Sequence, residues 1–205
     1  RMSGRRQGSL GQQVIGETVT GASGSAGPCR VAPAESDGYT LNFGTSSTRV
    51  LNGATMALPY VVVKDFEPVA LLSSQPLMIV ARKDMPANNL KELIVWLQSN
   101  QDKATQGTTG PGNMVHFAGA LFQETTNTRF AFVPYRGTNL AMQDLVAGRI
   151  DMIFDLASLS IPLMRAGAIK AYSVLAKERL AAAPDVPTVD EAGLPGFYIS
   201  IWMGL

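Results

Sequence analysis

Residues 130–155, FAFVPYRGTNLAMQDLVAGRIDMIFD, hold the pattern that decides the fold. Phe130–Val133 and Ile150–Asp155 are short apolar runs with the β-branched and aromatic residues that strands favour. Asn139–Gly148 lies between them, with the length of a helix and a glycine where the helix should end. A strand, a helix and a strand in this order predict a βαβ unit with a parallel pair of strands.

The alternation of helices and strands continues on both sides of this unit. Two helices have apolar residues spaced i, i+3, i+4 and i+7, which predicts one buried face on each. These residues are Leu90, Leu93, Ile94 and Leu97 in the first helix and Met114, Phe117, Ala118 and Leu121 in the second, at 113–125. Strands are also expected at 104–107 and 169–175, and a helix at 158–166. We therefore predict an α/β fold with a mostly parallel sheet.

The N-terminal half has weaker strand patterns. Tyr39–Phe43 alternates apolar and polar residues, as a half-buried strand does. Phe66–Leu72 and Leu77–Arg82 predict two strands, separated by the turn-like Ser73–Pro76. A short strand is also expected at Gln13–Glu17.

The composition excludes several classes of protein. The chain has 205 residues, of which 46% are hydrophobic and 16% charged, and this favours a globular protein over a disordered one. The net charge of +1 gives no electrostatic footprint for nucleic acid or for an anionic membrane. One cysteine, Cys29, excludes an internal disulfide, and one Cys with one His makes no zinc site. The longest apolar runs are too short to span a bilayer, and the arginine-containing start is not expected to be a signal peptide.

Ligands of such sheets bind beyond the carboxyl ends of the strands, so the loops after strands carry the function. The hydroxyls and amides of Gly44–Thr48 suit a carboxylate or phosphate, and plain helix capping is an equal alternative. Gly107–Asn113 has the glycine spacing of a phosphate loop. However, Asn113 and Met114 stand where a Lys and a Ser or Thr are required, which rejects a nucleoside triphosphate site. An anion site built from backbone amides without a lysine stays an open alternative in this loop. For His116 we favour a structural role over contact with a ligand.

Two more loops follow strands. In Pro134–Thr138, Tyr135 offers an aromatic wall with a hydroxyl and Arg136 a fork for carboxylates, although a packed tyrosine and a solvated arginine fit equally well. In Asp155–Ser158, capping or orienting the next helix is the simpler role for Asp155. The sequence has no nucleophile elbow, no dinucleotide-binding fingerprint and no pair of carboxylates spaced for acid–base catalysis. Nothing in it therefore predicts an enzyme. A module that binds a small anion fits these loops better.

Longer stretches match the ordered motifs of one known family. They are SDGYTL at 36–41, KDFEPV at 64–69, LKEL at 90–93, GTTGPGNMVHFAGALF at 107–122, VPYRG at 133–137, GRIDMIFD at 148–155, PDVPTVDEAGLPG at 184–196 and WMGL at 202–205. Over residues 10–205 the chain thereby resembles the substrate-binding proteins of tripartite tricarboxylate transporters, the Bug-type periplasmic receptors.

The resemblance implies a type II periplasmic binding protein fold, whose two lobes close on the ligand. Lobe I would take 1–103, lobe II 104–198, and 199–205 would begin the return crossing to lobe I. It also implies capture of a small organic carboxylate for a membrane permease, with no catalytic residues, metal or cofactor, in the periplasm. The implied ligand-binding residues are Thr45, Ser46, Ser47, Thr48 and Asn52 in lobe I and Thr108, Thr109, Gly112, His116, Tyr135, Gly137, Thr138 and Asp155 in lobe II.

The chain also departs from the family pattern. Family members carry a further strand and a glycine-bearing ligand loop before the segment that matches Leu10, and they continue past the WMGL segment into the first lobe. The usual ENRPG is ETVTG at 17–21, and Asn113 replaces a Ser or Thr. These departures imply an incomplete first lobe and weak or absent carboxylate binding by this chain alone. The alternative function is that of a shortened homologue without transport activity, which acts as a homo-oligomer or interaction protein through exposed edges of that lobe.

Overall fold

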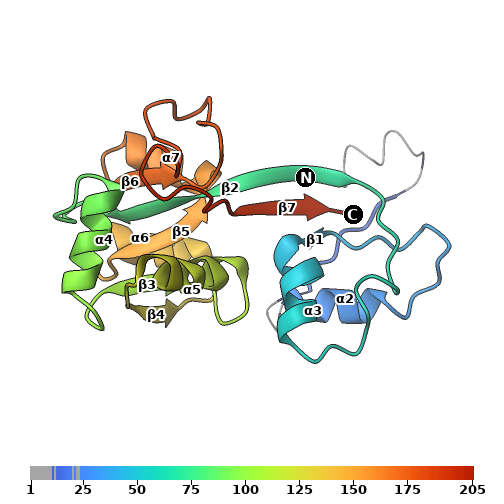
Figure 1. Cartoon of the computed structure of the whole chain (residues 1–205). Coiled ribbons are helices and arrows are strands. Elements are labelled where there is room, and N and C mark those ends of the chain that lie inside the picture. The colour runs from blue at the N-terminus through green and yellow to red at the C-terminus, as the bar shows by residue number, and fades with distance from the viewer. Residues whose placement is uncertain (1–10, 12, 20, 22–23) are drawn as a thin grey trace.

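The structure, a computed structural model, describes residues 11, 13–19, 21 and 24–205. Figure 1 shows two bodies joined by two long strands, β2 (Leu71–Arg82) and β7 (Ser200–Gly204). The first ten residues of the expected lobe I lie outside the described residues. Residues 13–17 form no strand with any described residue, so the strand predicted there is wrong.

The larger body contains the βαβ units that the sequence predicts. Its elements are α4 (Leu90–Ser99), β3 (Thr105–Thr108), α5 (Met114–Thr126), β4 (Ala131–Pro134), α6 (Thr138–Val146), β5 (Met152–Leu156), α7 (Ala157–Arg165) and β6 (Ile169–Val174). Strand β3 pairs in parallel with both β4 and β5, as the βαβ pattern requires. Strand β2 runs antiparallel to β5, β6 and β7, so the complete sheet is mixed.

Polar residues and glycines fix the helix ends. The Asn89 side chain accepts a hydrogen bond from the Glu92 N–H at 2.9 Å and caps the start of α4. Gly148 and Gly167 follow α6 and α7 with φ of 72° and 66°, a left-handed conformation that glycine adopts without strain. The predicted helix ends at these two glycines are confirmed.

The buried face of α5 differs from the one predicted. Val115, Ala118, Gly119 and Phe122 face the core, whereas Phe117 is 43% exposed. The prediction for Phe117 is therefore wrong, since the face is displaced by about one residue. The missing side chain of Gly119 lets α5 approach Gln106 and Phe132 of the sheet closely.

Strand β2 is one continuous strand of 12 residues, not the two strands predicted. The turn-like segment Ser73–Pro76 pairs with β7, in the register Ser73↔Met203 to Pro76↔Ser200. A register shift between Leu71 and Ser73 interrupts this pairing, and from Leu77 onward β2 pairs with β5 and β6 instead. Pairing with a strand from the far end of the chain thus overrides the local turn signal.

The smaller body is made of short elements. They are α2 (Ala26–Val31), β1 (Gly44–Thr45), the π-helical turn η2 (Ser47–Leu51) and α3 (Asn52–Thr55). The half-buried strand predicted at Tyr39–Phe43 is wrong: only Gly44 and Thr45 pair with β7, and Tyr39 is 77% exposed. An alternating pattern forms a buried strand only where a second apolar layer faces it, and the described residues provide none there.

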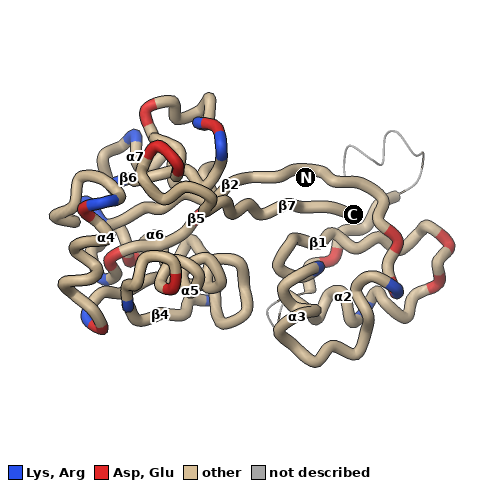
Figure 2. The backbone as a smooth tube through the Cα atoms, in the orientation of Figure 1, with Lys and Arg blue, Asp and Glu red and all other residues tan. Residues whose placement is uncertain are grey.

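One hydrophobic core fills the larger body. It runs from Leu77 of β2 through α4 to Ile199, and the rings of Phe122, Phe154 and Phe197 meet near its centre. The segment 77–99, which the resemblance assigned to lobe I, therefore packs with the larger body. Lys and Arg are interspersed with Asp and Glu along the chain (Figure 2), as the near-neutral net charge suggests.

Candidate functional site

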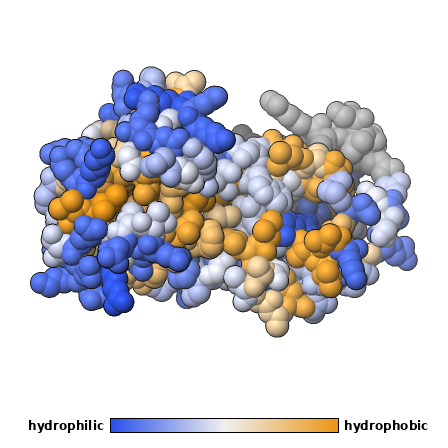
Figure 3. Space-filling model, viewed as in Figure 1, coloured by the Kyte–Doolittle hydropathy of each residue, from blue (hydrophilic) through white to orange (hydrophobic). Residues whose placement is uncertain are grey.

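A crevice of about 560 Å³ separates the two bodies. Leu51, Thr55 and Met56 line it from the smaller body. The residues that line it from the larger body are Pro111, Gly112, His116, Phe117 and Ala120. Most of these side chains are apolar, and Figure 3 shows apolar surface gathering over the smaller body and the junction.

The loop after β1 touches the N-terminus of α5 across this junction. Ser47 Oγ accepts a hydrogen bond from the Met114 N–H at 3.3 Å. The next two amides of α5, those of Val115 and His116, donate to the side chain of Asn113 at 2.8 and 3.1 Å. The first amides of this helix are therefore occupied by protein groups, so an anion site that uses these three amides is not available in this conformation.

Three buried polar atoms near the strand ends have no hydrogen-bond partner in the part of the chain that the structure describes. They are Ser46 Oγ, Thr108 Oγ1 and Asp155 Oδ1, on residues that are 1–3% exposed. Thr108 ends β3 and Asp155 lies near the end of β5, its parallel neighbour, so both stand at the same edge of the sheet. Buried polar atoms are nearly always paired, and unpaired ones in β3, in β5 and just before η2 are what a polar ligand or ordered water would satisfy.

Asp155 has the most unusual environment of the three. Its Oδ2 lies 3.4 Å from Ser160 Oγ, a weak contact. Burial raises the pKa of Asp155 to about 6, and hydrogen bonding to the Leu156 N–H and to Ser160 lowers it only in part. The burial of this carboxyl group therefore disfavours its charged form, and the group titrates nearer to neutral pH than an exposed aspartate does.

The hydroxyl of Tyr135 is engaged within the larger body. It donates to Asp144 Oδ2 at 2.8 Å, and Asp144 also accepts from Arg149 at 2.8 Å. Burial and the hydrogen bond to Asp144 raise the pKa of Tyr135 to about 12. This contact matches the packed tyrosine that the sequence left open, and Arg136 is exposed.

The other residues implied by the resemblance have diverse positions. Thr48 Oγ1 accepts from the Thr45 N–H and donates to the Thr45 carbonyl, which closes a local turn. Gly137 begins α6 without a side-chain cap, just before Thr138. Of the set, Gly112 and His116 line the crevice, and the His116 ring packs at 4.4 Å from that of Phe132. Asn52 is buried in α3, and Thr109 lies in the loop after β3.

The sequence analysis missed the apolar lining of the crevice. Leu51 and Thr55 are one helical turn apart, as are His116 and Ala120, so each pair shares a helix face. Phe117 beside them was assigned to the core. The spacing of four residues in the sequence could have indicated these helix faces. However, the same spacing is typical of a face that is buried in the core and of one that lines a crevice.

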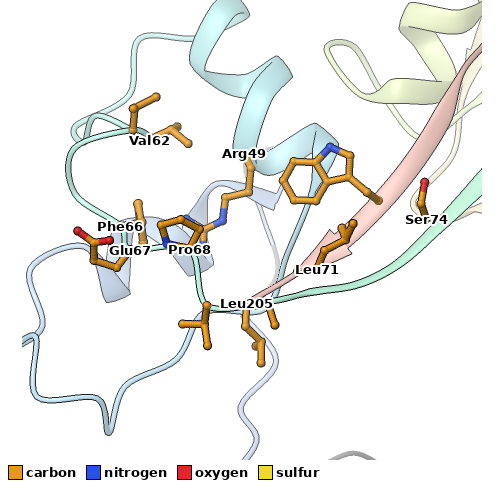
Figure 4. A pocket seen from close by; sticks show the side chains of 13 residues that line it. Arg49, Val62, Phe66, Glu67, Pro68, Leu71, Ser74 and Leu205 are labelled. Atoms are coloured by element: carbon orange, nitrogen blue, oxygen red, sulfur yellow. The ribbon is translucent and has the colours of Figure 1, made fainter.

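A second, larger cavity of about 790 Å³ lies on the smaller body, away from the predicted residues. Figure 4 shows Arg49 reaching into it near Phe66, with Leu205 at the C-terminal end of the chain; Trp202 of β7 also lines it. The Arg49 guanidinium stands 4.0 Å over the Phe66 ring, and burial lowers its pKa. The lining of this groove is mainly apolar, as is that of the crevice, and none of the ligand-binding residues implied by the resemblance lines it.

Neither a metal nor a membrane span is indicated by the described residues. They contain no group of three or more His, Cys, Asp and Glu side chains placed to hold a metal ion. Within the same residues, no helix is both long and apolar enough to cross a bilayer.

The fold and the crevice define the class: an α/β protein of two bodies with polar loops at their junction. The profile of the "Tripartite tricarboxylate transporter family receptor" matches residues 3–205. A curated relative from Agrobacterium vitis, encoded in the TAR-I ttuE-ttuC' intergenic region, is 38% identical over 196 residues and covers 96% of this chain. The chain belongs to the tripartite tricarboxylate transporter receptor family, whose members are periplasmic binding receptors.

Solved structures agree with this assignment. MatC from Rhodopseudomonas palustris with bound malate is 36% identical, with a TM-score of 0.90 over 99% of this chain and 69% of that one. The periplasmic binding protein BugD is 32% identical, with a TM-score of 0.88 over 99% of this chain and 68% of that one. The resemblance stated from the sequence motifs is confirmed. The chain spans 57% of the length of its A. vitis relative.

Proposed function

We propose that this chain is the solute-binding part of a periplasmic receptor that captures a small organic dicarboxylate and delivers it to a membrane permease. The observation that carries the proposal is the set of buried, unpartnered polar atoms of Ser46, Thr108 and Asp155 at the strand ends. A carboxylate bound at the edge of the sheet would accept a hydrogen bond from the Thr108 hydroxyl, and closure of the smaller body would bring Ser46 to the same ligand. The similarity to MatC, which has malate bound, supports a dicarboxylate as the ligand class.

The proposed ligand site is wider than these three residues. Gly137 and Thr138 at the uncapped start of α6 would offer backbone amides to a second carboxylate, where the helix dipole favours negative charge. Ser47 and Gly112 would approach the ligand from the two sides of the crevice. The remaining residues of the proposed set are Thr45, Thr48, Asn52, Thr109, His116 and Tyr135.

We also propose that the two bodies are the two lobes of this receptor. The continuous core of the larger body favours a boundary within β2, near Leu77, over one after residue 103. Strands β2 and β7 would then be the crossing strands, and closure about them would remove water from the crevice. No step of this mechanism breaks or forms a covalent bond.

Isothermal titration calorimetry with malate tests the proposal. Thr108→Ala should weaken malate binding at least several-fold, because it removes a hydroxyl from the proposed site. It should leave the fold intact, since that hydroxyl has no partner within the described protein to lose. Thr125→Ala is the matched control, because Thr125 is exposed at the far end of α5 and its hydroxyl bonds only within the helix, to the Leu121 carbonyl. Equal malate affinity in all three proteins would remove Thr108 from the site, and no heat from malate, succinate or citrate would refute the function.

A second candidate function is that of an interaction protein without transport activity. The observation that favours it is the exposed apolar surface of the smaller body and the adjoining start of β2, where Tyr39, Phe43, Val63 and Leu71 are each more than half exposed. Light scattering of the purified chain checks it. A stable dimer that binds no dicarboxylate would favour this function over the first.

A further inference from the structure

Asp151, just before strand β5, and Asp155, within it, have opposite environments. Asp151 precedes the strand and accepts hydrogen bonds from Arg82 Nε, the Thr105 N–H and Thr105 Oγ1, each at 2.9 Å. Asp155, four residues later, is 1% exposed; its carboxyl group accepts a hydrogen bond from the Leu156 N–H and lies 3.4 Å from Ser160 Oγ, and none of the described cations is paired with it. Its Oδ1 has no partner of normal geometry within the described residues. A buried carboxylate without a cation is rare, because the charged form loses its hydration without compensation.

The elements packed against β5 supply no cation to Asp155. Strand β2 carries Arg82, which is bound to Asp151, and α7 carries Arg165, which donates to the Ala182 carbonyl at 2.7 Å. The ionisable side chains of α5 are His116, at the crevice, and Glu124, and α6 carries Asp144, which is bound to Arg149. Burial is the leading cause of the raised pKa of Asp155, and no charged group is among the causes.

The position of Asp155 connects this property to the proposed ligand. Asp155 stands at the carboxyl edge of the sheet, next to the strand that ends in Thr108. In its charged form it would repel the carboxylates of a dicarboxylate bound at this edge, because burial leaves its charge poorly screened by water. In its neutral form it offers an O–H donor, and no described group lies in place to accept that hydrogen bond through Oδ1.

We propose that Asp155 is a specificity-determining residue that holds a proton in the complex and donates it in a hydrogen bond to a ligand carboxylate, so that each dicarboxylate bound takes up one proton from solvent. This inference rests on the proposed function and adds to it. The atoms balance: one proton leaves water, stays on Asp155 in the complex and returns when the ligand dissociates. The arrangement favours dicarboxylates without an ammonium group, because an ammonium would instead pair with the charged form of Asp155.

The experiment measures malate affinity by calorimetry at pH 6.5, 7.5 and 8.5. Once free Asp155 is ionised and the bound form protonated, the dissociation constant should rise about tenfold per pH unit. Asp155→Asn imitates the neutral carboxyl group, so its affinity should stay level over the same range. The exposed Asp84→Asn is the control and should keep the wild-type slope. A separate readout is the carboxyl carbon resonance of Asp155, whose titration midpoint should move to higher pH when malate is added.

The outcomes separate the inference from the function on which it rests. Malate binding that is level between pH 6.5 and 8.5 in the wild-type protein overturns the inference and leaves the proposed function standing. Binding of aspartate in preference to malate, lost in Asp155→Asn, assigns Asp155 to an ammonium group and also overturns it. Absence of malate binding at every pH, with the chain folded, refutes both.

Discussion

Asp155→Asn should stabilise the ligand-free protein at neutral pH. Burial raises the pKa of Asp155 from 3.8 to about 6, so the folded state binds the proton more tightly than the unfolded chain does. The stability that this proton gives is fully present below pH 3.8 and is lost as the pH rises through about 6. A shift of two pKa units corresponds to about 3 kcal/mol, which is the expected gain in unfolding free energy at pH 7.5. At pH 4.0 the gain should fall below about 1 kcal/mol.

Urea unfolding at the two pH values measures this difference directly. For a chain of this length the gain at pH 7.5 corresponds to about 6–12 °C in Tm. Asp151→Asn tests the opposite case, an aspartate whose charged form is well paired. The substitution weakens three short hydrogen bonds to the Asp151 carboxylate and should lower the unfolding free energy by about 2 kcal/mol at pH 7.5. If Asp155→Asn is no more stable than the wild type at pH 7.5, or if its gain is the same at pH 4.0, burial does not penalise the charged form of this carboxyl group and the reasoning fails.

Three further predictions concern α5, the helix at the crevice. Phe122→Ala removes a fully buried ring whose centroid lies 5.5 Å from that of Phe154, and it should lower the unfolding free energy in urea by about 3–5 kcal/mol. Phe117→Ala, at a half-exposed position, should lower it by less than about 1 kcal/mol. Equal losses in the two variants would contradict the observed helix face. Gly119→Ala places a methyl group 2.8 Å from the ring of a neighbouring phenylalanine and should lower the unfolding free energy by about 1–3 kcal/mol, and an unchanged Tm would refute the close approach. Asn113→Ala removes the acceptor of two helix amides and should cost about 1 kcal/mol in a thermal melt followed by circular dichroism; Asn113→Asp, which keeps the acceptor, should restore most of the loss.

Local chemistry predicted the larger body well. The helix that starts after Asn89 and the turns at Gly148 and Gly167 depend on hydrogen bonds and backbone angles within a few residues, so the sequence identifies them directly. The parallel pairing of β3 with its neighbours follows from the alternation of strands and helices.

The errors arose where distant partners decide the structure. Ser73–Pro76 has the composition of a turn, but β7, more than a hundred residues away, holds it in a strand. Tyr39–Phe43 has the alternation of a strand, but the described residues provide no layer to bury it. Phe117 has the spacing of a core residue, but the buried face of α5 is displaced by about one residue, and Phe117 lines the crevice instead.

For the candidate site, the sequence by itself determined which loops follow the strands and which hydroxyl and carboxyl groups they carry, because element order and side-chain chemistry are local properties. Its motifs also determined the family, which the comparisons confirm. Only the tertiary structure decided which of these groups have partners: Tyr135 is bound to Asp144, the first amides of α5 are occupied, and Asp155 is buried without a cation. Burial and hydrogen-bond pairing depend on contacts between residues that are far apart in the chain. They are therefore decided only when the two bodies and their sheet have formed.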